Sequence, residues 1–182
     1  MKTSVLVAYA TKKGSTREVA ESIATTLAAQ GLVVETRPAA DVGDLSPYGG
    51  VVLGSSIYTG RLHADARYFL RRHRHELTHK RFAVFALGPR TLEREDVANS
   101  RKQVDHELEK VPELSPLSVA VFGGVLDPEQ HHFPFNHMPK TDARDWNAIE
   151  SWADAISSEI SAPHVPDTLT GHRGEVTATV SM

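Results

Sequence analysis

Apolar and polar positions follow two different rhythms along the chain. In short runs such as Val5–Ala8 and Val51–Leu53 every residue is apolar, which is typical of strands covered on both faces of a parallel sheet. Between such runs, apolar residues recur every three or four positions, as at Val19, Ala20 and Ile23, which is typical of one face of a helix. The alternation of these rhythms predicts a doubly wound α/β domain with about five parallel strands and helices on both faces.

The remaining elements are predicted from the same two rhythms. Further strands are expected at Val33–Arg37, within Arg81–Gly88 and within Ser118–Leu126. Thr141 and Asp142 are residue types that cap helices, and they precede the last helical pattern. Three more helices are marked by residues at helical spacing: Ala66, Phe69, Leu70 and His73 for the first, Val97, Val104, Leu108 and Val111 for the second, and Trp146, Ile149, Ala153, Ile156 and Ile160 for the third.

A single domain followed by a tail is the predicted organisation. The chain has 182 residues, which is enough for one domain with a full core. Residues 163–182 contain two prolines, two glycines and little apolar content. We therefore expect a domain at residues 1–162 and a flexible tail at 163–182, although Glu175–Val180 could add an edge strand.

Charge and cysteine content exclude several functional classes. Lys and Arg number 20 against 23 Asp and Glu, so the net charge of −3 gives no overall basic field for nucleic acid. The chain has no cysteine, which excludes disulfides, thiolate catalysis and cysteine-bound metal or iron–sulfur centres. No run approaches the roughly 20 apolar residues of a membrane span. The start of the chain lacks the apolar region of a secretory signal, so a cytoplasmic location is expected.

The loop between the first strand and the first helix has the composition of a phosphate site. Its sequence, TKKGST at Thr11–Thr16, holds three hydroxyls and a glycine. A helix N-terminus offers unpaired N–H groups and positive partial charge, which favour an anion, and Gly14 lets the backbone approach it closely. The hydroxyls of Thr11, Ser15 and Thr16 can donate to phosphate oxygens. The alternative is that Ser15 or Thr16 only caps the helix, which needs a single hydroxyl.

The kind of phosphate ligand is narrowed by motifs that the sequence lacks. The Walker pattern and the dinucleotide pattern G-x-G-x-x-G are both absent, which argues against a P-loop nucleotide and against NAD(P) or FAD bound in the Rossmann manner. Receiver domains need an acidic cluster after the first strand and a phosphorylatable Asp after the third. This chain has Tyr9–Thr11 and Gly54–Ser56 at those places, so a receiver domain is excluded.

Two loops resemble those of flavodoxins. TKKGST resembles the FMN-phosphate loop, and GSSIYTGRLH at Gly54–His63 resembles the second flavin loop. The pairing is most similar to flavodoxin-like proteins of the menaquinone-dependent protoporphyrinogen oxidase type, in which a G-x-S-I segment precedes an aromatic residue, a glycine and a histidine. Thr141–Ile156 is similar to the terminal helix of that group. The resemblance spans about Lys2–Ile160 and implies a flavodoxin-like five-stranded parallel sheet of order 2-1-3-4-5, with FMN as the cofactor.

The same resemblance implies a set of FMN-binding residues in three loops at the carboxyl ends of the strands. They are Thr11, Lys12, Lys13, Gly14, Ser15 and Thr16 in the first loop, Ser55, Ser56, Ile57, Tyr58, Thr59 and Gly60 in the second, and Leu87, Gly88 and Arg90 in the third.

Several of these residues have expected roles. The Tyr58 ring can stack on the flat isoalloxazine, although it could also be an ordinary surface tyrosine. Gly88 can offer backbone groups to the pyrimidine edge of the flavin. Arg90 can stand near N1 and stabilise the anionic reduced flavin, or it can simply pair with Glu93 or be solvated. The loop at Gly88–Asp96 has no aromatic residue, unlike electron-carrier flavodoxins, so one flavin face is expected to be open.

Histidines give weaker candidates. His63 could be a proton donor on the substrate side, or an ordinary solvated histidine at the start of a helix. His131, His132 and His137 lie together in a proline-punctuated loop without the spacing of a preorganised ligand set, so no metal site is predicted. No protein nucleophile is expected, because the flavin would carry the chemistry.

The sequence thus predicts an FMN-binding, flavodoxin-like redox protein. The first hypothesis is a flavin-dependent oxidoreductase that exchanges hydride or electrons with a small organic substrate, such as a porphyrinogen, or with a quinone. The second is a one-electron carrier that docks on a partner reductase. The third is a flavodoxin-fold interaction module without flavin. The substrate, reduction potential and oligomeric state stay open.

Overall fold

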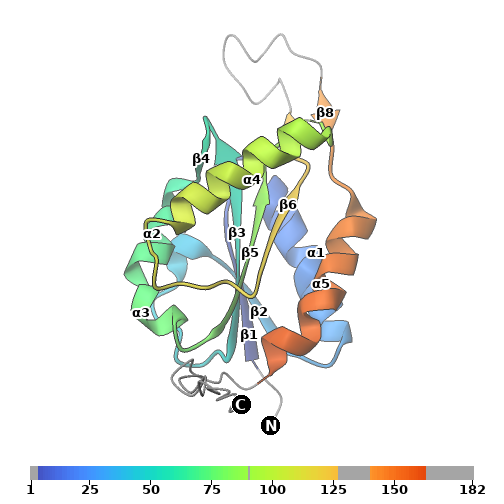
Figure 1. The fold of residues 1–182 in the computed structure, drawn as a ribbon. Coiled ribbons are helices and arrows are strands. Elements are labelled where there is room, and N and C mark those ends of the chain that lie inside the picture. The colour runs from blue at the N-terminus through green and yellow to red at the C-terminus, as the bar shows by residue number, and fades with distance from the viewer. Residues whose placement is uncertain (1–3, 90, 127–139, 163–182) are drawn as a thin grey trace, which may run out of the picture.

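Five parallel strands form the central sheet of the structure, a computed structural model that describes residues 4–89, 91–126 and 140–162. The strands are β1 (Ser4–Ala10), β2 (Val33–Pro38), β3 (Gly50–Tyr58), β5 (Arg81–Leu87) and β6 (Ser118–Phe122). Their spatial order is β2-β1-β3-β5-β6 (Figure 1). Because β5 and β6 are the fourth and fifth parallel strands, this confirms the predicted fold and the order 2-1-3-4-5.

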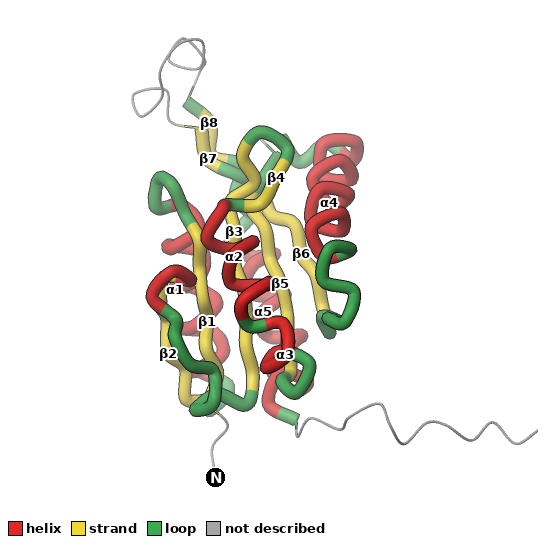
Figure 2. The backbone as a smooth tube through the Cα atoms, turned by 90° about the vertical axis from the view of Figure 1, so that its left-hand side faces the viewer, coloured by secondary structure: helices red, strands yellow, loops and turns green. Residues whose placement is uncertain are grey.

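Two short antiparallel pairs lie beyond the carboxyl ends of the long strands (Figure 2). The first pair is a hairpin in which β4 (Arg61–Leu62) folds back on the end of β3. The second pair joins β7 (Val125–Leu126) to β8 (Thr141–Asp142) in a separate two-stranded sheet. Both pairs therefore stand at the edge where ligands bind in open α/β sheets.

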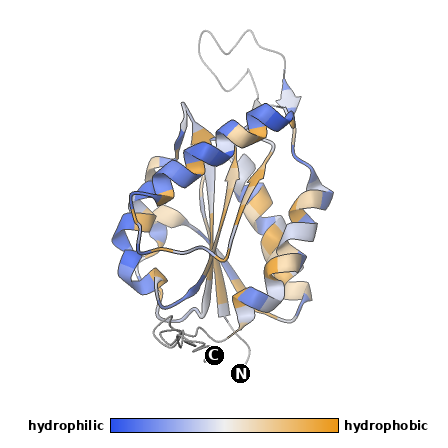
Figure 3. Cartoon of the chain, in the orientation of Figure 1, coloured by the Kyte–Doolittle hydropathy of each residue, from blue (hydrophilic) through white to orange (hydrophobic). Residues whose placement is uncertain are grey.

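Helices cover both faces of the sheet, as Figure 1 shows. One face carries α1 (Ser15–Ala29) and α5 (Trp146–Ser161), and the other carries the 3-10 turn η1 (Ala39–Asp41), α2 (Ala64–Arg72), α3 (Arg74–Leu77) and α4 (Arg94–Leu108). The apolar sides of these helices face the sheet and their polar sides face outward (Figure 3). No helix in the described ranges is both long and apolar enough to cross a membrane.

Alternating strand residues divide the core into two clusters. In β1, Val5 and Val7 pack with the α1 and α5 side, whereas Leu6 and Ala8 pack with the side of α2 and α4. This is the two-residue period of a strand covered on both faces. Since all four residues are completely buried, the apolar run that predicted the first strand is explained by burial on both sides.

Several predicted boundaries were wrong. β3 continues to Tyr58, five residues beyond the predicted end, because Ser55 and Ser56 pair with β5 and the last two residues pair with β4. Thr141 and Asp142 do not cap the last helix. They form β8, and Asp145 caps α5 by accepting a hydrogen bond from the Ala148 N–H at 3.1 Å.

Helix ends differ as well. The helix predicted from Ala66 to His73 ends at Arg72, and the short α3 begins at Arg74. The helix predicted from Val97 to Val111 ends at Leu108, although Val111 is buried. The tail at 163–182, including Glu175–Val180, and the three histidines at 131, 132 and 137 lie outside the described residues.

Candidate functional site

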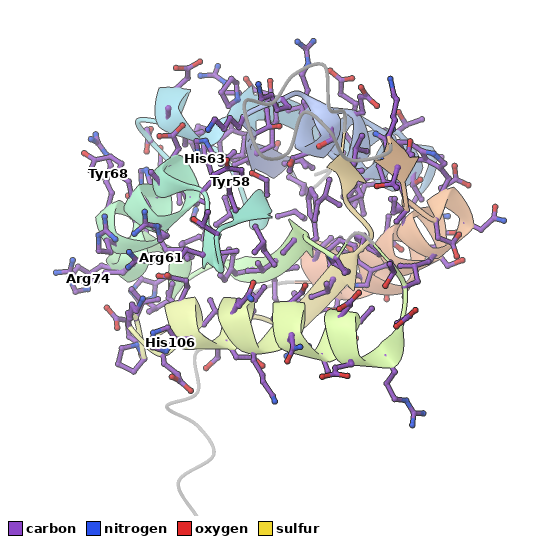
Figure 4. The ribbon with its side chains drawn as sticks, turned by 90° about the horizontal axis from the view of Figure 1, so that it is seen from above. Tyr58, Arg61, His63, Tyr68, Arg74 and His106 are labelled. Carbon is purple, nitrogen blue, oxygen red and sulfur yellow. The ribbon has the colours of Figure 1, made fainter. Side chains whose placement is uncertain are left out.

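The predicted site lies at the carboxyl edge of the sheet, which Figure 4 shows from above. Three segments lie at the ends of strands β1, β3 and β5 there: residues 11–14, the β3–β4 hairpin, and residues 88, 89 and 91–93. Adjacent strands of one sheet bring these segments side by side, since β3 pairs with both β1 and β5. The parallel topology thus gathers the loops that the sequence singled out.

The loop after β1 leaves the start of α1 open to an anion. Gly14 occupies the N-cap position with φ of 91°, a left-handed conformation that favours glycine, and no side chain in the described part of the chain caps the helix. The Thr11 hydroxyl accepts a hydrogen bond from the Gly14 N–H at 3.0 Å. Thr11 therefore shapes the loop, and its own proton stays available as a donor.

Thr16 carries an unsatisfied polar atom in the first turn of α1. Its side chain is completely buried, and its hydroxyl oxygen has no hydrogen-bond partner among the described residues. Burying a hydroxyl without a partner costs about 1–3 kcal/mol by protein mutational data. The predicted alternative, in which Ser15 or Thr16 serves only as a helix cap, is not what the structure contains, because Gly14 is the N-cap.

The two serines of β3 have different surroundings. The Ser55 hydroxyl accepts from the His63 N–H and donates to the Ser56 carbonyl, both at 3.0 Å, so it fastens the end of the hairpin. The Ser56 hydroxyl is buried with no partner in the described ranges. Successive strand residues point to opposite faces. Of the two serines, Ser56 is therefore the one with hydrogen-bonding capacity to spare for a ligand.

The hairpin turns through two residues in the left-handed region. Thr59 has φ of 48° and Gly60 has φ of 77°, between the paired residues Tyr58 and Arg61. Positive φ at both central positions is the type I′ geometry that matches the twist of a tight hairpin. For a β-branched residue such as Thr59 this conformation is strained, at a cost of about 1–2 kcal/mol. The turn is thus shaped at the expense of some stability.

Lys12 connects the first loop to the hairpin. Its ammonium nitrogen lies 4.5 Å from the centroid of the Tyr58 ring, within the range of a cation–π contact. The Tyr58 side chain is 41% exposed. The two predicted ends of the flavin site, one for phosphate and one for the ring, are therefore in contact through this pair.

A cleft of about 650 Å³ opens between the hairpin and α4. Its lining includes five of the predicted residues, four of them in the β3–β4 hairpin and one, Gly88, in the third loop. The complete set is Ile57, Tyr58, Thr59, Gly60, Gly88, Pro89, Thr91, Asp96, Asn99, Ser100, Gln103, Gly124 and Val125.

Helix α4 supplies a polar wall of this cleft that the sequence analysis missed. Asp96, Asn99, Ser100 and Gln103 all line it. These positions are three or four apart and so share one helix face. The spacing is visible in the sequence, and it is the signal that could have identified this wall. The Gln103 side-chain nitrogen lies 3.9 Å from where a Cβ on Gly60 would stand, so this wall reaches the hairpin turn.

In the third loop, Gly88 lines the cleft, but one of its two backbone groups already has a partner. The Gly88 N–H is not available for a ligand, because it donates to the Phe122 carbonyl at 3.2 Å. Leu87 is only 3% exposed and packs in the core on the α1 and α5 side, so it does not line the cleft. Arg90 lies outside the described residues, and its role near N1 stays a prediction.

His63 is placed at the start of α2. Its Nδ1 accepts a hydrogen bond from the Asp65 N–H at 3.3 Å, which makes it the N-cap of the helix. It is not among the residues that line the cleft. The geometry matches the helix-start alternative and gives no support to a proton donor beside the flavin.

The buried carboxylate of Glu107 in α4 contacts the β4 strand of the hairpin through an ion pair with Arg61. Glu107 is 5% exposed, and its oxygens lie 3.0 Å from Lys110 Nζ and 3.5 Å from Arg61 Nε. Burial pushes the pKa of Glu107 upward, but Lys110, Arg67 and Arg61 outweigh it and hold the pKa below its ordinary value. Glu107 is thus an ionised anchor between α4 and β4.

Comparison with known proteins identifies the family. A family model described as "Flavodoxin domain" matches residues 6–138, more than half of the chain. The chain belongs to the flavodoxin-domain family. Among curated proteins, none has significant sequence similarity to this flavodoxin domain.

Solved flavodoxins share the fold. A short-chain flavodoxin associated with a non-canonical PDU bacterial microcompartment has a TM-score of 0.61 at 17% identity, covering 87% of this chain and 99% of that one. A mutant of the flavodoxin from Pseudomonas aeruginosa has a TM-score of 0.58 at 16% identity, with the same coverage. Oxidised Flavodoxin 2 from Bacillus cereus has a TM-score of 0.55 at 23% identity, covering 86% and 99%. These similarities support membership of the flavodoxin-domain family, and they do not support the more specific protoporphyrinogen oxidase type.

Proposed function

We propose that this flavodoxin domain binds FMN and is a flavin redox protein. The observation that carries the proposal is the buried Thr16 hydroxyl, which has no partner among the described residues and lies in the first turn of a helix without a side-chain cap. A phosphate at this helix N-terminus would accept hydrogen bonds from backbone N–H groups and from Thr16. Gly14 supports the fit, because no described atom lies within 4 Å of where its Cβ would be.

The rest of FMN would extend from this loop into the cleft. Ser56 has a buried hydroxyl with no described partner, which suits a ribityl hydroxyl. Tyr58 supplies an aromatic face on the cleft wall, and Gly88 lines the same cleft. In this arrangement the chain's own residues bind and orient the cofactor, and the ring system of FMN supplies the redox chemistry when it is bound.

A small organic oxidant or reductant, such as a quinone, is the first candidate for the second substrate. The supporting observation is the polar wall on α4, where the amides of Asn99 and Gln103 line the same cleft as Tyr58. An amide can donate to a quinone carbonyl and accept from a quinol hydroxyl. Electron transfer to a partner protein is the second candidate, supported by the flavodoxins among the structural neighbours, one of which is described as oxidised.

Flavin binding is tested by titrating the apoprotein with FMN and with riboflavin, which lacks the phosphate. We expect a one-to-one complex that quenches or shifts the flavin spectrum, and an affinity for riboflavin at least about tenfold lower because charge-assisted hydrogen bonds are lost. Inorganic phosphate should compete with FMN. A protein that binds neither flavin would refute the proposal and favour the interaction module.

The two redox candidates are separated with the reduced holoprotein. It is mixed anaerobically with menadione, a soluble quinone that takes up two electrons and two protons to form the quinol, or with an oxidised haem protein. Saturable reoxidation by menadione supports the oxidoreductase. Reoxidation by the haem protein with no saturation by menadione would support the carrier.

A further inference from the structure

A strongly basic segment adjoins the cleft, and the exposed residues after its first three have no role in the site described above. Residues 61–81 contain seven Lys and Arg against two Asp and Glu, a net charge of +5. The whole chain has a net charge of −3, so the other 161 residues carry −8. The segment begins in β4, which pairs with β3 in the cleft wall, and continues through α2 and α3.

Exposed arginines and a tyrosine from this segment form one face of the molecule. Figure 4 shows Arg61, Tyr68 and Arg74 on the same side, next to the hairpin that carries Tyr58. Arg71 and Arg72 are exposed between them in the sequence. We name Arg61, Tyr68, Arg71, Arg72 and Arg74 the basic face.

Part of this charge has no partner of its own. Arg61 pairs with Glu107 and Arg74 with Glu113, at 3.5 and 3.3 Å. Arg71 and Arg72 have no carboxylate within ion-pair distance in the described part of the chain, so their charge is left for a partner.

Tyr68 gives the face the character of a protein interface. Its side chain is 51% exposed, and the Arg72 guanidinium donates to its hydroxyl at 3.1 Å while lying 6.0 Å from the ring centroid. Arg72 is thereby held in place on an exposed aromatic surface. Tyrosine and arginine are among the residues enriched at the centres of protein interfaces.

We infer that the basic face docks an acidic redox protein, which exchanges electrons with the flavin in the neighbouring cleft. The inference rests on the proposed function, and it adds the chemistry of the partner. Each electron that the partner gives up is gained by the flavin, and any accompanying proton comes from water. Because the other 161 residues carry −8, an extended polyanion such as RNA or an anionic membrane would be repelled beyond this face. A compact acidic protein would not be repelled in this way, because an interface of about 800 Å² per partner is confined to the basic face.

The test maps binding on ¹⁵N-labelled protein by NMR, with and without FMN. The probes are a plant-type ferredoxin, which is acidic, and cytochrome c, which is basic. We expect the ferredoxin to shift amides of β4 and α2, and the shifts to fade between about 0.05 and 0.5 M salt as charges are screened. Cytochrome c should leave these amides unshifted. Shifts centred elsewhere, or equal shifts with both probes, would overturn the inference.

Two variants with the same change in charge sharpen the result. In the double variant Arg71→Glu and Arg72→Glu, the Kd for ferredoxin should rise by at least about tenfold, the effect of reversing charges at a steered interface. The control, Arg94→Glu with Lys102→Glu, changes exposed residues of α4 outside the cleft lining and should stay within about twofold of the parent. Equal losses in both variants, or tighter binding of an RNA oligonucleotide or of phosphatidylserine vesicles than of ferredoxin, would overturn the inference.

The outcome is distinguishable from a failure of the proposed function. Docking on the basic face needs no flavin, so the amide shifts should appear in the apoprotein as well. FMN binding is measured separately through flavin absorbance. A protein that binds FMN but shows no shifts in β4 and α2 refutes the docking surface alone.

Discussion

Replacing Thr16 by valine should move protein stability and flavin affinity in opposite directions. The Thr16 hydroxyl is buried with no described partner, so the apoprotein bears a desolvation cost that valine, of nearly the same shape, removes. The free energy of unfolding of the apoprotein should rise by about 1–2 kcal/mol. In the complex the same change deletes a hydrogen bond to a charged phosphate, which contributes about 1.5–3 kcal/mol. The Kd for FMN should therefore rise by about 10- to 150-fold.

Both quantities are measurable on one preparation, the stability by urea unfolding of the apoprotein and the Kd by quenching of FMN fluorescence. Thr26→Val is the matched control, because Thr26 lies on the same helix and its hydroxyl donates to the Ser22 carbonyl at 3.2 Å. The control should leave the Kd unchanged and should not stabilise the protein. A Thr16→Val variant with unaltered FMN affinity, or with a less stable apoprotein, would refute the reasoning.

Four further outcomes are expected. Thr59→Asn should raise the free energy of unfolding by about 1 kcal/mol, measured by thermal melting, because asparagine tolerates the left-handed φ of 48° better than threonine. Gly54→Ala should cost about 1–3 kcal/mol, since its Cβ would stand 2.1 Å from an aromatic ring, whereas Gly43→Ala meets no described atom within 4 Å and should cost little. Glu107 has a lowered pKa when folded, so it stabilises the protein above its ordinary value of 4.5 and loses this effect as the pH falls. Urea unfolding of Glu107→Gln should therefore show lower stability at pH 7 and a flatter decline in acid. Tyr58→Ala should raise the Kd for FMN about 2- to 12-fold if the ring stacks on the flavin, and an unchanged value removes Tyr58 from the site.

The fold could be predicted because burial on both faces leaves a direct trace in the sequence. β1 reads as an unbroken apolar run for this reason, and α1 repeats apolar residues at helical spacing. β3 was predicted too short since Gly54, Ser55 and Ser56 are residue types of loops. In the structure they are ordinary strand positions, and Gly54 is required by the ring of Phe85, a contact that comes from the neighbouring strand.

Only the part of the site that is formed by neighbouring residues in the sequence could be predicted. Hydroxyls and a glycine before a helix mark the first loop from sequence alone. Ser55 differs from Ser56 because its hydroxyl accepts a hydrogen bond from the His63 N–H at the end of the hairpin. The Gly88 N–H is engaged because it donates to Phe122 of β6. The polar face of α4 can be recognised from its spacing in the sequence, but that it borders the cleft depends on where the helix packs. Each of these is a tertiary relationship that no single stretch of sequence contains.

The contact between Lys12 and Tyr58 makes the two halves of the site thermodynamically dependent on each other. The single ammonium group of Lys12 cannot make both interactions at full strength: neutralising a phosphate dianion near Gly14, and the cation–π contact with the Tyr58 ring at 4.5 Å. In the proposed complex, a ligand that carries phosphate would draw the cation away and uncover the ring, while a ligand without phosphate would meet a ring with one face already covered. Selection for the phosphorylated form of a flavin would then exceed what the phosphate contacts alone contribute.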